Sequence, residues 1–271
     1  MMKSLTRRRQ LFEFNDLSTV PKAWRESVVE ALGRTLDWGG MLQGLVPHLA
    51  RFYSEARVRE VLDLGAGTGI PAAILVRELL ALGIEPPRTY LTDLFPLEDQ
   101  WVELEREHAP YISFIAEPVD ATSVDTKRIG QGRARQLINI FHHFPEEVAR
   151  GVLEDAIKAR QPIFISEQFF RRPTQFLNFA PAGIASLYVN PLFTKEHRLA
   201  KALWTWCSPV MLGISIWDGI ISTMRIYEPA DLMRMVQSID GHEEYSWRHG
   251  TFSYLPKGEG FYFCGVPHRR A

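Results

Sequence analysis

The chain has 271 residues, 46% of them hydrophobic and 23% charged, and a formal net charge of −1. These values are ordinary for a globular protein whose core needs no disulfide or metal to be stable, and a nearly neutral chain provides no basic field for nucleic acid. Cys207 and Cys264 show no disulfide or metal-ligand spacing. We therefore expect a cytoplasmic protein that acts on small molecules.

The N-terminal residues show no export signal. Arg7, Arg8 and Arg9 are followed by the segment 11–16, whose polar residues interrupt any signal-peptide core. The longest apolar stretch, 202–217, contains a proline and is shorter than the roughly 20 residues that cross a bilayer. The sequence thus predicts neither export nor membrane insertion.

Two helices are predicted before the first strand, over residues 21–36 and 41–53. Pro21 suits a first helical turn, and Trp24, Val28 and Leu32 recur at helical spacing before Gly39 and Gly40 end the pattern. We expect residues 1–56 to form an N-terminal helical extension that acts as a lid. It is too small to be a stable domain by itself.

The segment 61–69, VLDLGAGTG, combines an apolar strand, a carboxylate at the strand end and three glycines at alternate positions. Glycines allow a tight turn that a ligand can approach closely, and the next residues open a helix. A dinucleotide-binding turn has a similar outline, but its pyrophosphate would be repelled by a carboxylate such as Asp63. Asp63 favours a cationic ligand instead.

Strand and helix patterns alternate from residue 58 to residue 168. Strands are expected at 58–64, 88–93, 112–116, 136–141 and 162–167, with helices at 70–82, 97–108 and 145–160 between them. This alternation predicts an α/β fold with a doubly wound, mostly parallel sheet. The strand 162–167 is continuously apolar, as in the middle of such a sheet, and its last residue, Glu167, is expected to point toward the ligand edge.

The remaining chain is expected to contain one insertion, one helix and one hairpin. Residues 169–226 form an aromatic-rich and proline-rich insertion that is too long for a plain connection; such insertions usually cover active sites. A helix is expected from residue 228 to 236, and strands 243–252 and 260–266 form an antiparallel hairpin. The prediction is one catalytic domain, 57–271, that contains the insertion.

The segment 61–69 resembles the first motif of class I S-adenosylmethionine-dependent methyltransferases of the small-molecule type. The resemblance implies a seven-stranded sheet, S-adenosyl-L-methionine as the cofactor, and a donor site at Asp63, Gly65, Ala66 and Gly67. The strand 88–93 ends in Asp93, where the family places an acid on the ribose hydroxyls, with Leu94 beside it. The third strand is followed by Asp120 and Ala121, which resemble the adenine contact, with Asp125 and Glu117 as competitors.

Three further candidate site residues lie at or after the end of the fourth strand, and a fourth lies in the first N-terminal helix. The resemblance places Asn139, as a strand-interior asparagine, on the methionine part of the donor. His142 and His143 are similar to the His-His turn of several small-molecule methyltransferases, and either imidazole can act as a base because histidine titrates near neutral pH. His143 is the first choice, against a turn histidine that only shapes the pocket. Arg25 is expected to pair with the carboxylate of the donor, against an ordinary surface role.

These residues predict an enzyme that transfers a methyl group from S-adenosylmethionine to a small-molecule acceptor, in keeping with a biosynthetic role. A cyclase or lyase that uses the sulfonium on the same fold and releases methylthioadenosine is the second hypothesis, and a non-catalytic S-adenosylmethionine-binding scaffold is the third. A nicotinamide enzyme is the fourth. The expected partners are a small-molecule substrate and, as one option, a second copy in a homodimer; no metal, nucleic acid or membrane is expected.

Overall fold

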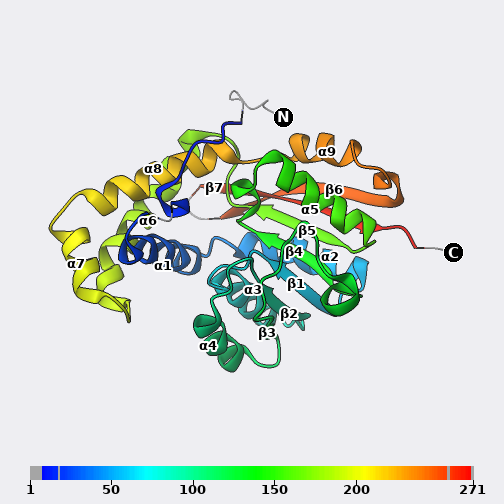
Figure 1. Cartoon of the computed structure of the whole chain (residues 1–271), viewed down its shortest axis with the longest axis horizontal. Coiled ribbons are helices and arrows are strands. Elements are labelled where there is room, and N and C mark those ends of the chain that lie inside the picture. Colours follow the sequence, from blue (N-terminus) through cyan, green and yellow to red (C-terminus); the bar gives the residue numbers. More distant parts are fainter. Residues whose placement is uncertain (1–7, 18, 255–256, 270–271) are drawn as a thin grey trace. The chain divides into compact units, whose positions relative to one another are not determined.

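The structure is a computed structural model that describes residues 8–17, 19–254 and 257–269 (Figure 1). The chain divides into two compact units. Of the described residues, the first unit comprises 8–17, 19–41, 169–226, 253–254 and 257–259, and the second comprises 42–168, 227–252 and 260–269. The start of the predicted N-terminal extension, residues 1–7, and the centre of the predicted hairpin turn, residues 255 and 256, lie outside the described residues.

The second unit is built on a seven-stranded sheet with the order β3-β2-β1-β4-β5-β7-β6. Its strands are β1 (Glu60–Leu64), β2 (Arg88–Thr92), β3 (Ile112–Phe114), β4 (Ala134–Ile138), β5 (Ile163–Glu167), β6 (Tyr245–Tyr254) and β7 (Gly258–Pro267). The first five run parallel, and β7 pairs antiparallel with β5. The predicted doubly wound sheet with an antiparallel C-terminal hairpin is confirmed.

Five α-helices of this unit precede or connect its strands along the chain. They are α2 (Val46–Ala56), α3 (Ile70–Ala81), α4 (Glu98–His108), α5 (Glu146–Lys158) and α9 (Pro229–Gln237). Each lies within a few residues of its predicted range, because the apolar positions that define the pattern are also those that are buried. Pro71 and Pro229 occupy first-turn positions, where a missing N–H costs no helical hydrogen bond.

The register of the parallel strands brings their carboxyl ends together at one edge. Asp63 of β1 stands opposite Leu91 of β2 on one side and Gln136 of β4 on the other. Below this edge Leu91 and Trp101 are fully buried with Val76 of α3 in one apolar cluster. The turns that follow β1, β2, β4 and β5 are therefore held on a rigid base.

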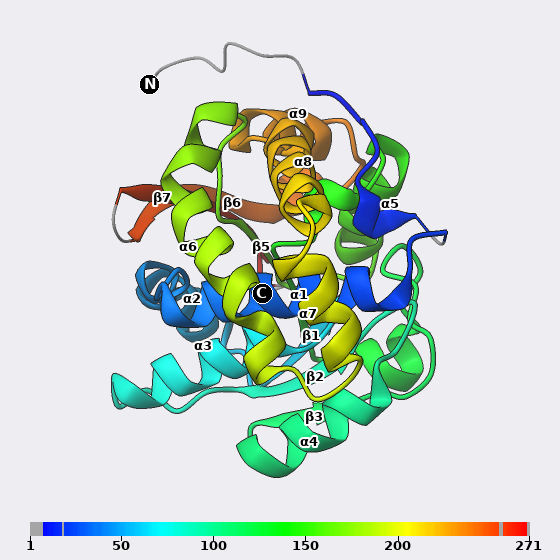
Figure 2. The same cartoon turned by 90° about the vertical axis from the view of Figure 1, so that its left-hand side faces the viewer.

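The first unit is helical, and the insertion supplies most of it. It contains α1 (Lys22–Trp38), α6 (Pro173–Phe193), α7 (Arg198–Trp206) and α8 (Val210–Arg225), which Figure 2 shows from a second side. Ala31 of α1, Leu187 of α6 and Met211 and Ile214 of α8 form its buried apolar cluster. The described residues up to Met41 thus share one compact unit with the predicted insertion 169–226, whereas residues 42–56 belong with the sheet.

No single helix of the described residues is long and apolar enough to cross a membrane. The helices α7 and α8 are long and apolar enough only when they are taken together, and they are bent by 83° at the break between them.

The function of residues 1–56 as a lid stays a prediction.

Candidate functional site

The turn after β1 has the conformation that its glycines make possible. Gly65, Gly67 and Gly69 all have positive φ values, of 73°, 52° and 76°. A Cβ atom on Gly69 would lie 2.7 Å from side-chain atoms of Leu91 and Leu104, so any side chain there would clash. A Cβ atom on Gly67 would have no neighbour within 4 Å. The backbone at Gly67 is therefore open to close approach by a ligand.

Asp93 holds this turn from the end of β2. Its Oδ2 accepts a hydrogen bond from the Gly67 amide at 3.0 Å, and its Oδ1 accepts one from the Phe95 amide at 2.9 Å. The indole N–H of Trp101 donates to the Gly67 carbonyl at 2.8 Å, and the buried Ala66 donates its amide to Thr92 O at 2.9 Å. The predicted donor residues of the first and second strands thus lie together, with Leu94 exposed beside them.

Asp63 is a buried acid held from the neighbouring strand. The hydroxyl of Tyr53 donates to Gln136 Oε1 at 2.5 Å, so the amide nitrogen of Gln136 is the atom that can donate to Asp63. Burial raises the pKa of Asp63 to about 7, with a smaller increase from the nearby charge of Asp93, while the hydrogen bond from Gln136 opposes the shift. A cation beside Asp63 would stabilise its ionised form.

Asn139 was expected inside the fourth strand, but it lies just beyond the end of that strand. The fourth strand ends at Ile138, and Asn139 has a φ of 59°, a left-handed conformation that asparagine tolerates better than most residues. Its Oδ1 accepts a hydrogen bond from the Gln168 amide at 2.9 Å, and its own amide donates to Ser166 O at 2.9 Å. Asn139 therefore joins the ends of β4 and β5; its contact with a donor stays a prediction.

Asp120 and its competitors differ in their partners. The carboxylate of Asp120 accepts hydrogen bonds through Oδ1 from the amide and the hydroxyl of Thr122, at 2.8 and 2.7 Å. Asp125 instead caps the helical turn 126–130, and Glu117 pairs with Arg128 at 3.1 Å. Asp120 is exposed and Ala121 half-buried. The adenine contact of both residues stays a prediction.

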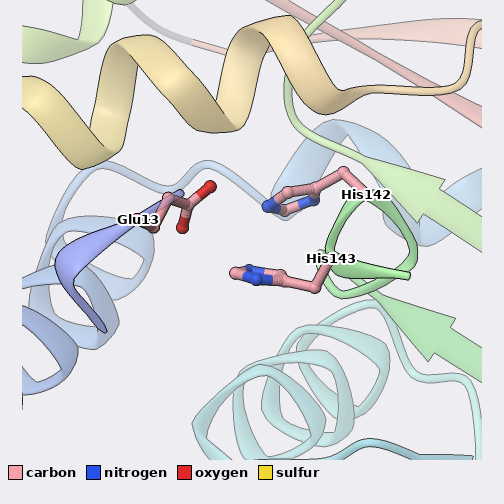
Figure 3. Close-up of side chains that lie close together, drawn as sticks. All are labelled: Glu13, His142 and His143. Atoms are coloured by element: carbon pink, nitrogen blue, oxygen red, sulfur yellow. The ribbon is translucent and has the colours of Figure 1, made fainter. Parts of the chain in front are cut away.

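The two histidines lie on the short helical turn Phe141–His143 that follows β4, with ring centroids 4.2 Å apart (Figure 3). Nδ1 of His142 lies 2.8 Å from Glu167 Oε2, and the His142 amide donates to Glu167 Oε1 at 2.9 Å. His142 and Glu167 are both buried, whereas His143 is half-buried. Glu13, drawn in the same figure, belongs to the first unit.

Glu167 fixes which nitrogen of His142 can take up a proton. When Glu167 accepts a hydrogen bond from Nδ1–H, Nε2 is the ring nitrogen with a lone pair. The apolar strand 162–167 predicts Glu167 at the ligand edge, but its partner cannot be read from the sequence. The signal was present, because an acid that ends a continuously apolar strand rarely serves the core.

The donor turn and the histidine turn are neighbours. A Cβ atom on Gly65 would lie only 3.0 Å from Cγ1 of Ile140, two residues before His142. Asp63, Gly67, Asp93 and His142 therefore belong to one edge of the sheet, the carboxyl edge at which open α/β folds bind ligands.

Arg25 belongs to the first unit and has partners there. Its Nη2 donates to the carbonyl groups of Leu17 at 3.0 Å and Val20 at 3.4 Å, so the guanidinium fastens the segment before α1. The pairing of Arg25 with a donor carboxylate stays a prediction.

Neither the family models nor the curated proteins contain a match to this chain. Among solved structures, the trans-methyltransferase CalH in complex with S-adenosylhomocysteine is similar, with a TM-score of 0.51 and 16% identity over 87% of this chain. The match covers 59% of the CalH chain, so this chain corresponds to about three fifths of it. This likeness shows that the chain has the fold of class I S-adenosylmethionine-dependent methyltransferases.

Two further structures match less closely. The O-methyltransferase NcsB1 from neocarzinostatin biosynthesis, in complex with S-adenosylmethionine and 2-hydroxy-5-methyl naphthoic acid, is 12% identical over 90% of this chain and 57% of its own, with a TM-score of 0.48. Magnesium protoporphyrin IX methyltransferase from Synechocystis, with bound S-adenosylhomocysteine, is 12% identical over 92% and 89%, with a TM-score of 0.44.

Proposed function

We propose that this chain is an enzyme that binds S-adenosylmethionine at the turn 65–69 and transfers its methyl group to a small-molecule acceptor. The observation that carries the proposal is the pair His142–Glu167, which lies at the same sheet edge as the open backbone of Gly67 and the acids Asp63 and Asp93. A donor site with a positioned base beside it is suited to group transfer.

The residues of the donor site fit this cofactor. S-adenosylmethionine carries an ammonium and a sulfonium and supplies an electrophilic methyl group when bound. The ionised form of the Asp63 carboxyl is disfavoured by burial, so a cationic neighbour would stabilise it. Asp93 supplies carboxylate oxygens suited to ribose hydroxyls, and Gly67 leaves room for close approach of the ligand.

His142 is the residue that we assign as general base, in place of the first choice, His143. With Nδ1 held by Glu167, its Nε2 can remove the proton of an acceptor hydroxyl as that oxygen receives the methyl group. Glu167 orients the ring through Nδ1, so it is a positioning residue. The acceptor class that best fits such a base is a small molecule with an ionisable hydroxyl, while an amine is the second choice.

The test measures S-adenosylhomocysteine formed from S-adenosylmethionine with pools of hydroxylated small molecules, for the wild type and for His142→Ala, Glu167→Gln and His143→Ala. We expect His142→Ala to lower kcat on the order of 100-fold to 10,000-fold with unchanged affinity for S-adenosylmethionine. Glu167→Gln should lower kcat less and shift its pH profile, and His143→Ala should retain most turnover.

The products also separate the alternatives. Methylthioadenosine in place of S-adenosylhomocysteine would favour the cyclase or lyase, and binding without any product would favour the scaffold. Full turnover in His142→Ala would remove this residue as the base while leaving the donor site intact.

A further inference from the structure

Helix α7 has its polar face inward and its apolar face outward. Lys201 and Thr205 are buried, whereas Leu199, Leu203 and Trp206, which share one face at helical spacing, are 87%, 57% and 49% exposed. An ordinary surface helix has the opposite arrangement. The exposed face of α7 is therefore more apolar than the solvent-facing side of an ordinary surface helix.

Ion pairs fix α7 in this orientation. The ammonium of Lys201 lies 2.8 Å from Glu30 Oε1 and 3.0 Å from Glu26 Oε2, both on α1, and it donates to Thr194 Oγ1 at 2.7 Å. Rotating α7 to bury its leucines would break both ion pairs of the buried Lys201 ammonium. The apolar face is thus held outward by the fold.

Helix α6 extends this face into a continuous patch. Trp206 Nε1 donates to Tyr188 O at 2.8 Å, and Arg198 Nε donates to Pro191 O at 2.9 Å, so the end of α6 lies alongside α7 (Figure 2). We define the α6–α7 patch as five exposed apolar side chains: Tyr188, Leu192, Leu199, Leu203 and Trp206.

The area of the α6–α7 patch matches what a protein interface needs. At roughly 200 Å² for each large side chain, the exposed fractions sum to about 600 Å², the upper end for a typical monomer. Two such patches would bury about 1,200 Å² in total, above the approximate 1,000 Å² threshold for a specific interface. In a two-fold symmetric dimer the same patch is used on both copies.

We propose that the α6–α7 patch is the surface through which two copies of this chain form a homodimer. The composition, with leucine, tyrosine and tryptophan at the centre, is typical of such interfaces. The rim carries charges of both signs, Glu196 and Arg198, rather than the basic field that an anionic lipid surface attracts. A net charge of −1 also means that two copies hardly repel each other.

The test is sedimentation velocity of the full chain over a range of micromolar concentrations. We expect the wild type to sediment with twice the mass of one chain. The double variant Leu199→Glu with Leu203→Glu should raise the dimer dissociation constant on the order of 100-fold or more, because it places unpaired charges in the contact. The matched control is Leu80→Glu with Leu82→Glu, two exposed leucines in and just after α3, which should leave the dimer intact.

All four substituted positions are exposed, so we expect both double variants to fold. Circular dichroism checks this. A wild-type mass of one chain over the whole range, or a dimer that survives the Leu199 and Leu203 changes, would overturn the proposal. So would sedimentation with phosphatidylcholine vesicles by a wild-type monomer but not by the patch variant, since this result would assign the patch to a lipid surface.

Discussion

At the scale of single residues, Asp63 is an acid whose ionisation depends strongly on its burial. Its carboxyl is buried, hydrogen-bonded by Gln136 and close to Asp93, and burial raises its pKa from the ordinary value of 3.8 to about 7. In the native state the proton is therefore retained to a higher pH than in the unfolded chain. Between these two pKa values the native state binds more protons, so the free energy of unfolding falls as pH rises.

Asp63→Asn should remove this dependence. At about 1.4 kcal/mol per pH unit, the wild type should lose on the order of 3–4 kcal/mol relative to the variant between pH 4 and pH 7, and little more above pH 8. Urea unfolding of both proteins without cofactor at pH 5, 6, 7 and 8 measures this difference. A constant difference across the series would show that Asp63 is ionised throughout.

Asp93→Ala should weaken S-adenosylmethionine binding by on the order of 1.5–3 kcal/mol, the worth of a hydrogen bond to a charged group. Because Asp93 also accepts the amides of Gly67 and Phe95, Asp93→Asn is the control that retains an acceptor oxygen. Isothermal titration calorimetry measures both variants. Unchanged affinity in Asp93→Ala would remove this residue from the site.

Residue types at strand ends could be predicted from the sequence, but their partners could not. Asp63 lies near the end of β1 and Asp93 directly follows β2, so their meeting at one sheet edge follows from the parallel fold. The contact between His142 and Glu167 joins residues 25 positions apart through the geometry of two turns. The left-handed conformation of Asn139 and the end of β4 at Ile138 depend on the same local geometry, and the hydrophobic pattern carries no information about it.

At the scale of elements, α8 holds the segment 8–17 through buried charges. Nη1 of Arg225 lies 3.1 Å from Glu13 Oε1 and 2.6 Å from Asp16 Oδ2. The Nε of Arg225 donates to Leu11 O at 2.7 Å. Asp218, two turns earlier on the same helix, accepts the Phe14 amide at 2.7 Å. The segment is thus fixed within its own unit by buried ion pairs. Removing one partner of such a pair is destabilising because it leaves the other charge buried and uncompensated.

Arg225→Met should release this segment, because it removes the cation that lies 3.1 Å from the buried carboxylate of Glu13. We expect chymotryptic cleavage at Phe12 and Phe14 to accelerate at least tenfold, as measured by mass spectrometry of timed digests. Ser222→Ala, which removes only the 3.0 Å hydrogen bond to Glu13, is the milder control and should have a smaller effect. Equal cleavage rates in Arg225→Met and the wild type would contradict this role of Arg225.

The elements of the sheet could be predicted more closely than those of the insertion. Alternating strand and helix patterns are local, and the parallel sheet follows from their order. Residues 169–226 are apolar on several sides, with Pro181 and Pro191 inside α6, so periodicity did not separate α6, α7 and α8. Their positions are set by contacts with α1, such as those of Lys201, which are distant in sequence.

At the scale of the whole molecule, the chain combines a methyltransferase fold with a helical unit formed by its N-terminal residues and the insertion. The sheet unit contains the groups proposed for the donor and the base. Nothing in the composition identifies the acceptor, because methyl transfer from a sulfonium depends mainly on alignment and demands no fixed set of catalytic residues. Acceptor specificity therefore has to be measured.

The most direct measurement follows the methyl group itself. The protein is incubated with S-adenosylmethionine labelled in its methyl carbon and with a pool of hydroxylated small molecules, and the labelled products are separated by mass. We predict that the label appears in a small molecule that gains one methyl group, with an equal amount of S-adenosylhomocysteine and with loss of both products in His142→Ala. Label retained in S-adenosylmethionine, or released as methylthioadenosine, would contradict methyl transfer.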